Sequence, residues 1–157
     1  MEQGFGAYIR QQFMVGECDL NHYSPLVLAY IGDAIYELIL RTVVISKGNK
    51  QVNKLHRETS RYAKAQAQAV MIDTLFPMLT EEEKDIYKRG RNAKSHTTAK
   101  NASVIDYRKA TGFEALMGYL YLSDNLSRLT ELVKEALAKY TPNEHQGMEA
   151  RNWQEGK

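Results

Sequence analysis

Apolar residues recur every three or four positions along the segment 25–47, which is the period of one face of a helix. The residues on this stripe are Val27, Leu28, Ile31, Ala34, Ile35, Leu38 and Ile39. Ser24 followed by Pro25 is typical of a helix start, with an N-cap residue before a proline in the first turn. Gly48 and Asn49 interrupt the pattern. The sequence therefore predicts a long helix that ends near Lys47.

The same periodicity predicts further helices along the rest of the chain. Thr80 and Glu83 have the spacing of a capping box, which predicts a helix from there to Arg89. Leu126, Leu129, Leu132, Val133, Ala136, Leu137 and Tyr140 form the apolar stripe of a last helix. The other predicted helices cover residues 52–58, 61–75 (ended by Pro77) and 103–122. We therefore predict a helix for every periodic segment.

No segment alternates like a half-buried strand, and no internal repeat is evident. Residues 1–22 lack a clear period, residues 90–102 are polar and aperiodic, and the chain is polar after Pro142. We therefore predict an all-α fold with one domain over residues 23–141. An N-terminal arm, 1–22, and a polar C-terminal tail, 142–157, are expected to flank it.

Composition is that of an ordinary globular protein, with 157 residues, 43% hydrophobic and 25% charged. Cys18 is the one cysteine, so an internal disulfide is excluded, and no Cys/His spacing suits a zinc site. No apolar stretch has the length of a membrane span, and the N-terminus does not resemble a secretory signal. We expect a cytoplasmic protein that does not contact a membrane.

Positive charge is concentrated in one part of the chain although the net charge is only +2. Between Lys84 and Lys109 there are eight Lys and Arg residues against two Asp residues. Such a segment is either a solvated loop or a surface for the phosphates of a nucleic acid. Four polar residues of an earlier predicted helix could extend that surface or simply belong to an exposed helix: Arg61, Lys64, Gln66 and Gln68.

Two acidic residues, Asp33 and Glu114, each stand alone within an apolar helical segment. On a helical wheel, one face carries Leu26, Ala29, Tyr30, Asp33 and Glu37, and another carries Tyr107, Ala110, Thr111, Glu114, Gly118 and Tyr121. If these faces meet, the two carboxylates converge. Two carboxylates with water and substrate phosphates suffice for Mg²⁺. The alternative is that each acid is paired with a basic side chain or a backbone donor.

These two segments resemble the motifs of a known family. The segment 28–35 reads Leu-Ala-Tyr-Ile-Gly-Asp-Ala-Ile and is similar to the ribonuclease III signature, Leu-Glu-Phe-Leu-Gly-Asp-Ala. The segment 113–122 reads Phe-Glu-Ala-Leu-Met-Gly-Tyr-Leu-Tyr-Leu and is similar to the second acidic motif of that family. The resemblance covers about residues 24–138 without the usual double-stranded-RNA-binding domain. With the block Lys-Arg-Gly-Arg-Asn-Ala-Lys-Ser at 88–95, it resembles the compact bacterial mini-ribonuclease III branch.

The resemblance implies a homodimeric, Mg²⁺-dependent endoribonuclease that cuts double-stranded RNA and leaves 5′-phosphate ends. It implies that Asp33 and Glu114 are the catalytic residues and metal ligands. It also implies a role in maturing the 23S ribosomal RNA precursor, with help from a large-subunit ribosomal protein. The expected RNA-binding residues are Lys88, Arg89, Arg91, Asn92, Lys94, Ser95 and Lys100.

The chain departs from the fuller family at Leu26, Ala29 and Thr111, where other members carry acids. The sequence does not decide whether Glu37, Asp73 or Asp106 compensates. One alternative function is therefore a scaffold that binds structured RNA without cutting it. Another is a nucleotide pyrophosphohydrolase, which requires dense clusters of glutamates. The one dense cluster here, at 81–83, lies at a predicted helix start, where acids are favourable for another reason.

Overall fold

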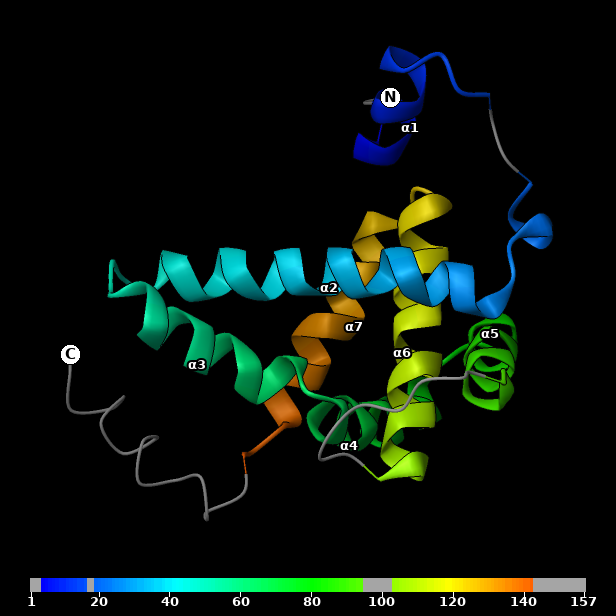
Figure 1. Ribbon diagram of the computed structural model, residues 1–157. Helices are drawn as coiled ribbons and strands as arrows, with labels where there is room; N and C mark the ends of the chain where they lie inside the picture. Colours follow the sequence, from blue (N-terminus) through cyan, green and yellow to red (C-terminus); the bar gives the residue numbers. More distant parts are fainter. Residues whose placement is uncertain (1–3, 17–18, 95–102, 143–157) are drawn as a thin grey trace.

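The structure is a computed structural model that describes residues 4–16, 19–94 and 103–142 (Figure 1). Its helices are α1 (Phe5–Gln12), α2 (Pro25–Ser46), α3 (Val52–Ala63), α4 (Ala65–Leu75), α5 (Glu81–Asn92), α6 (Val104–Leu122) and α7 (Leu126–Lys139). Short 3-10 turns cover Leu20–His22 and Phe76–Met78. The described residues contain no strand, so the predicted all-α class is confirmed. None of the described helices has the length and apolar character needed to cross a membrane.

Helix α6 is the centre of the fold, with α2, α4, α5 and α7 packed around it (Figure 1). Its residues Phe113, Leu116 and Met117 are completely buried. The Phe113 ring meets the ring of Tyr36 from α2 edge to face, with 5.0 Å between the ring centroids. The helix that carries Glu114 is therefore held on several sides.

The crossing of α2 and α6 depends on two glycines. A Cβ atom added at Gly32 would collide with the backbone carbonyl of Glu114 and would lie 2.8 Å from the amide nitrogen of Gly118. A Cβ atom added at Gly118 would collide with the carbonyl of Leu28. The two helices can approach this closely because neither glycine has a side chain. The crossing point therefore lies directly beside Asp33 and Glu114.

The helix starts predicted from capping residues are confirmed. The Ser24 hydroxyl accepts a hydrogen bond from the backbone N–H of Val27, at 3.2 Å. Thr80 and Glu83 form the complete capping box at the start of α5. Pro77 lies in the 3-10 turn that follows α4. Local side-chain chemistry therefore determines where these helices begin.

The boundary between the third and fourth helices differs from the prediction. Helix α3 extends to Ala63, and the break comes at Lys64, whose ψ of 152° is extended. Tyr36 donates a hydrogen bond from its hydroxyl to the carbonyl of Tyr62, at 2.6 Å. The side-chain amide of Gln68 donates to the carbonyl of Ala63, at 2.7 Å. Tyr36, which is distant in sequence, and Gln68, which lies in the next helix, thus satisfy the end of α3, and no glycine or proline marks the break.

The inward face of α2 also differs from the predicted stripe. The buried residues are Leu28, Ala29, Gly32, Tyr36, Leu40 and Val44, whereas Val27, Ala34 and Leu38 are exposed. Because α2 is apolar on nearly every side, periodicity could not identify the side that faces α6. The close approach at Gly32 selects it.

Two shorter stretches correct the prediction as well. Helix α1 occupies part of the predicted aperiodic arm and lies near the end of α6, where Gly6 is next to the Tyr121 ring. Helix α5 continues to Asn92 because Gly90 packs against Gly112 and Ala115 of α6. The predicted loop at 90–102 therefore begins three residues later, and its residues 95–102 lie outside the described residues, as does the tail after 142.

Candidate metal and RNA site

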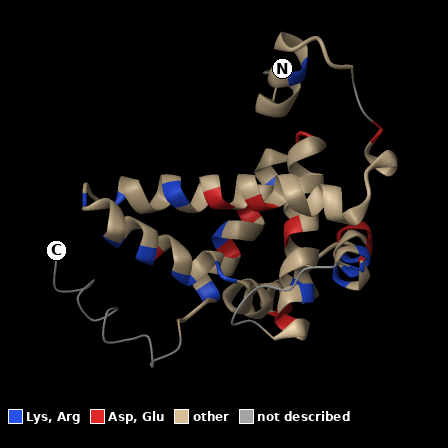
Figure 2. Ribbon diagram, viewed as in Figure 1, with Lys and Arg blue, Asp and Glu red and all other residues tan. Residues whose placement is uncertain are grey.

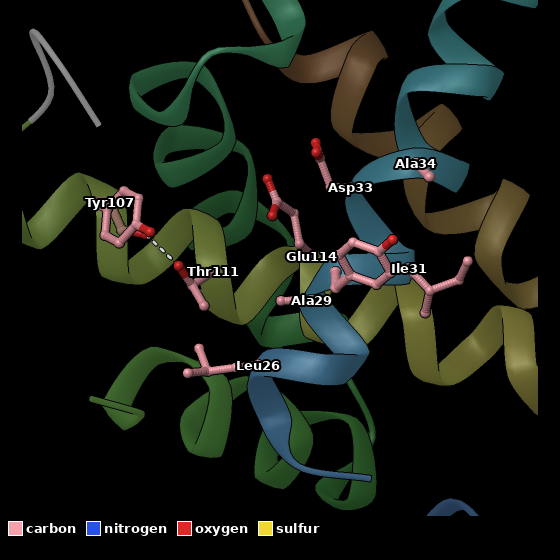
Figure 3. Close-up of a pocket in the computed structure, with 9 residues that line it drawn as sticks. Leu26, Ala29, Ile31, Asp33, Ala34, Tyr107, Thr111 and Glu114 are labelled. Carbon is pink, nitrogen blue, oxygen red and sulfur yellow. Dashed lines mark hydrogen bonds between the residues drawn. The ribbon is translucent and has the colours of Figure 1, made fainter. Parts of the chain in front are cut away.

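Asp33 of α2 and Glu114 of α6 line the same groove, which has a volume of about 490 Å³. Figure 3 shows the two side chains extending from neighbouring helices toward the same space. The residues that line the groove are Leu26, Ala29, Tyr30, Ile31, Asp33, Ala34, Tyr107, Thr111 and Glu114. The two helix faces identified on the helical wheel therefore meet, and they bring the two acids together.

The groove is unfavourable for negative charge in the absence of a cation. Burial raises the pKa of Glu114 to about 8, and the neighbouring Asp33 carboxylate adds to this rise. Partial burial, followed by the charge of Glu37, raises the pKa of Asp33. Among the described residues, no lysine or arginine lines the groove. Arg41, also on α2, donates a hydrogen bond to Glu37, with 2.8 Å between Nη2 and Oε1.

This donor set fits a divalent cation. The Asp33 carboxylate raises the pKa of Glu114, and carboxylate oxygens are the ligands that a hard ion such as Mg²⁺ prefers. The alternative in which Asp33 and Glu114 are paired with basic side chains has no support among the residues lining the groove. With two carboxylates, the remaining coordination positions would be left to water and substrate oxygens.

The three positions at which the motif resemblance implies further acids all lie in the groove. Leu26 and Ala29 line it from α2, and Thr111 lines it from α6 (Figure 3). The Thr111 hydroxyl donates a hydrogen bond to the carbonyl of Tyr107, at 3.0 Å. The groove is therefore poorer in carboxylates than the family motif, but it retains the space in which they would lie.

The acids considered as substitutes do not join Asp33 and Glu114. Asp73 forms an ion pair with Lys109, at 2.6 Å. Asp106 lies in the first turn of α6, where its backbone N–H donates to the Ser103 hydroxyl. Glu37 is near Asp33 but is bonded to Arg41. No described group of three or more Asp, Glu, His or Cys residues is arranged to hold a metal.

Gln68 is a residue of this site that the sequence did not identify. It was predicted on an exposed face, but only 1% of its surface is accessible. Its side-chain amide nitrogen lies 3.1 Å from Oε1 of Glu114. Gln68 therefore contacts the candidate metal ligand from the side of α4. Alternation of Gln and Ala along α4 was misleading because both residue types are common on exposed helices.

The predicted RNA-binding residues divide between α5 and the part of the chain outside the described residues. Lys88, Arg89, Arg91, Asn92 and Lys94 lie at or just after the C-terminal end of α5. This end is next to the groove, because a Cβ atom at Gly90 would lie 3.3 Å from the carbonyl oxygen of Thr111. Ser95 and Lys100 are not among the described residues.

The basic side chains of α5 contact neighbouring groups within the protein. Lys88 lies over the ring of Phe76, 5.7 Å from its centroid, and Arg91 lies over the ring of Tyr87, at 5.5 Å. Arg89 is 3.3 Å from the carboxylate of Asp85. These contacts hold the positive charges along one helix end, and Figure 2 shows the basic residues gathered there.

A second basic surface, on α3, was only partly predicted. Lys54, Arg57, Arg61 and Lys64 are spaced by three or four residues, so they follow one side of this helix and its end. Figure 2 shows basic residues along α3. Arg61 and Lys64 were predicted from the sequence but the other two were not, although the spacing of all four indicates one helix side.

Comparison with known proteins gives consistent similarities. The profile of the Ribonuclease III domain family matches residues 26–125. A Clostridium tetani protein named Mini-ribonuclease 3 is 53% identical over 78% of this chain and 82% of its own length. A Thermoanaerobacter protein of the same name is 46% identical over 85% of this chain and 94% of its own. A crystal structure of a Fusobacterium nucleatum protein superimposes with a TM-score of 0.69 and 29% identity, covering 76% of this chain and 96% of that one.

Proposed function

The chain belongs to the ribonuclease III family, as an endoribonuclease of the mini-ribonuclease 3 group, and from this membership we propose that it cleaves double-stranded RNA with Mg²⁺ held by Asp33 and Glu114. The observation that carries this proposal is the convergence of these two carboxylates in one groove without a basic partner among the residues that line it. We propose that they are both the metal ligands and the catalytic residues.

The two carboxylates of the groove have the central part in this reaction. Asp33 and Glu114 would hold the ion from the neighbouring helices α2 and α6. Leu26, Ala29 and Tyr30 line the groove beside Asp33 with apolar side chains. A divalent ion held there would supply Lewis-acid chemistry, which lowers the pKa of water and offsets negative charge on a phosphodiester. The expected products carry 5′-phosphate and 3′-hydroxyl ends.

The RNA is positioned by the basic residues at the end of α5. Lys88, Arg89, Arg91 and Lys94 supply positive charge, and Asn92 supplies a compact donor for phosphate and sugar oxygens. We assign the same role to Ser95 and Lys100. Duplex RNA is recognised by its shape, phosphates and 2′-hydroxyls. Binding by these residues is therefore expected to depend little on sequence and strongly on salt.

We further propose that two copies form a homodimer with one groove for each RNA strand. Apolar side chains at the N-terminal end of α2 remain exposed, with Tyr30 82% accessible and Leu26 and Val27 also accessible. Exposed apolar side chains grouped on one helix are typical of a surface that pairs with another protein. The resemblance described from the sequence points to a second copy of this chain as that protein.

The substrate that we propose is the 23S ribosomal RNA precursor, in the cytoplasm, with a large-subunit ribosomal protein as an assisting partner. This part of the proposal rests on the family resemblance of the two acidic motifs and of the basic block at 88–95.

The competing function is an RNA-binding scaffold that does not cleave. The absence of carboxylates at Leu26, Ala29 and Thr111 favours it, whereas the paired acids in the groove favour cleavage. A cleavage assay on labelled duplex RNA with Mg²⁺ decides between them. We expect cleavage by the wild type, loss of at least about 100-fold in Asp33→Asn, and near-normal activity in Asp73→Asn. Equal traces of activity in wild type and Asp33→Asn would support the scaffold.

A further inference from the structure

Gln68 is a buried polar residue in contact with the acid pair. Its side chain extends from α4 and is 1% exposed. The amide nitrogen donates one hydrogen bond to the carbonyl of Ala63, at 2.7 Å, and a second to Oε1 of Glu114, at 3.1 Å. Both N–H bonds of one amide group are thus directed at two acceptors that belong to different helices.

The orientation of this amide is determined by its surroundings. Turning it over would place its oxygen against the carbonyl oxygen of Ala63, which can only accept a hydrogen bond. The Ala63 carbonyl is the last of α3 and is fixed by the helix end. Because the Ala63 carbonyl requires a donor, the amide nitrogen stays on this side, where its second N–H meets Oε1 of Glu114 and restricts the position of that side chain.

We propose that Gln68 is a positioning residue for the metal site, which orients the Glu114 carboxylate toward Asp33 before the ion binds. The proposal rests on the proposed function, because it requires that Glu114 is a metal ligand. Groups that hold the ligands of a metal are known to contribute 10-fold to 100-fold to metal affinity. Gln68 acts through Glu114 and is not itself assigned to the substrate or the ion.

A purely structural role is the alternative. In that case Gln68 would serve only to satisfy the end of α3 through Ala63, as Tyr36 does through the carbonyl of Tyr62. Replacing Gln68 would then lower the stability of the protein but would leave its affinity for a metal ion unchanged. Measurements of metal binding and of stability therefore separate the two roles.

The primary test is the variant Gln68→Met, which preserves the length of the side chain and removes both N–H donors. Its matched control is Gln66→Met, the same change at an exposed position two residues earlier on α4. Mg²⁺ binding to the full-length chain is measured by titration calorimetry without RNA, and folding is checked by circular dichroism. We expect the dissociation constant to rise about 10-fold in Gln68→Met and to stay unchanged in Gln66→Met.

A double-variant cycle shows whether the effect passes through Glu114. Gln68→Met is combined with Glu114→Gln. Because Gln68 acts through Glu114, we expect Gln68→Met to cause no further loss of Mg²⁺ affinity in the protein that already carries Glu114→Gln. The Mg²⁺ dependence of RNA cleavage provides a further readout. The half-saturating Mg²⁺ concentration should rise in Gln68→Met, and excess Mg²⁺ should restore most of kcat.

Each result has a distinct meaning. Asp33-dependent binding in the wild type with an unchanged affinity in Gln68→Met would overturn the role of Gln68 and leave the proposed function intact. Binding in the wild type that does not change in Asp33→Asn would contradict the proposed function itself. If Gln68→Met does not fold, Gln68→Asn replaces it, because its side chain is shorter by one methylene and cannot bridge both acceptors.

Discussion

At the scale of single residues, the site combines two acids that the sequence identified with one amide that it did not. Asp33 and Glu114 were identifiable because a lone carboxylate within an apolar helix requires a partner. Gln68 was not identifiable because a buried glutamine and an exposed one look the same in an alternating Gln and Ala segment. Burial is a property of the packed helices, so the contact between Gln68 and Glu114 became visible only in the structure.

The raised pKa of Glu114 predicts how the stability of the metal-free protein depends on pH. Its pKa is about 8 in the folded chain, against an ordinary value of 4.5, and burial is the main cause. Between these values the folded state binds more protons than the unfolded state, so the free energy of unfolding falls as pH rises. The contribution of Glu114 to the free energy of unfolding is fully present below about pH 4.5 and is lost as pH rises to 8. One pKa unit corresponds to about 1.4 kcal/mol.

Urea denaturation in EDTA at several pH values measures this dependence. The variant Glu114→Gln cannot ionise at this position, so its stability should decrease less between pH 5 and 8 than that of the wild type. Saturating Mg²⁺ should reverse the wild-type trend, because the ion binds the deprotonated carboxylate. Parallel curves for wild type and Glu114→Gln would contradict the assignment.

At the scale of elements, helix starts followed from local chemistry, whereas one helix break and one helix face did not. Ser24 and Thr80 cap their own helices, so their roles were readable from the sequence. The break at Lys64 depends on Tyr36 and Gln68, which are distant along the chain or in the next helix. The inward side of α2 is selected by its contact with α6, which no pattern within α2 contains.

The crossing of α2 and α6 is predicted to tolerate no side chain at Gly32. The change Gly32→Ala would place a methyl group against the backbone carbonyl of Glu114 and force the helices apart. We expect a loss of about 3 kcal/mol in the free energy of unfolding, together with loss of cleavage, as measured by urea denaturation and a duplex-RNA assay. Gly16→Ala is the control, because nothing lies within 4 Å of its added Cβ. Equal stability of the two variants would show that α2 and α6 are not packed so closely.

The two basic elements are predicted to contribute separately to RNA binding. Replacing Arg91 and Lys94 by alanine should weaken binding and reduce the slope of log affinity against log salt by about one for each phosphate that the variant no longer neutralises. Lys54→Ala with Arg57→Ala tests α3 in the same way. Lys139→Ala is the control, since Lys139 lies on α7, 3.5 Å from Glu135.

Fluorescence anisotropy with a labelled duplex at several salt concentrations gives these slopes, and circular dichroism checks the fold. An unchanged slope in Arg91→Ala with Lys94→Ala would remove the end of α5 from the RNA surface. The same result for the α3 variant would limit the surface to α5.

At the scale of the whole molecule, the all-α class was predictable because helical periodicity runs through most of the chain and no segment alternates. The packing of four helices around α6 was not predictable from periodicity, since each helix pattern describes only its own faces. The fold matters for function because it brings two acids, about eighty residues apart in sequence, into one groove. The homodimer stays a prediction.

The dimer prediction concerns the exposed apolar end of α2. The change Tyr30→Lys would place a charge on this surface without altering the buried core, since Tyr30 is 82% exposed. We expect light scattering to give twice the mass of the chain for the wild type and the mass of one chain for the variant. A wild type that stays monomeric at tens of micromolar, or a variant that stays dimeric, would contradict the predicted interface.

If Asp33 and Glu114 act together on one metal ion, as proposed, the single-turnover rate of duplex-RNA cleavage in a double-variant cycle should show it. Residues that act as a unit have strongly non-additive effects. We predict that Asp33→Asn and Glu114→Gln each lower the rate by at least about 100-fold, and that the double variant is no slower than the slower single variant. Wild-type rates in either single variant, or losses that multiply in the double variant, would contradict the claim.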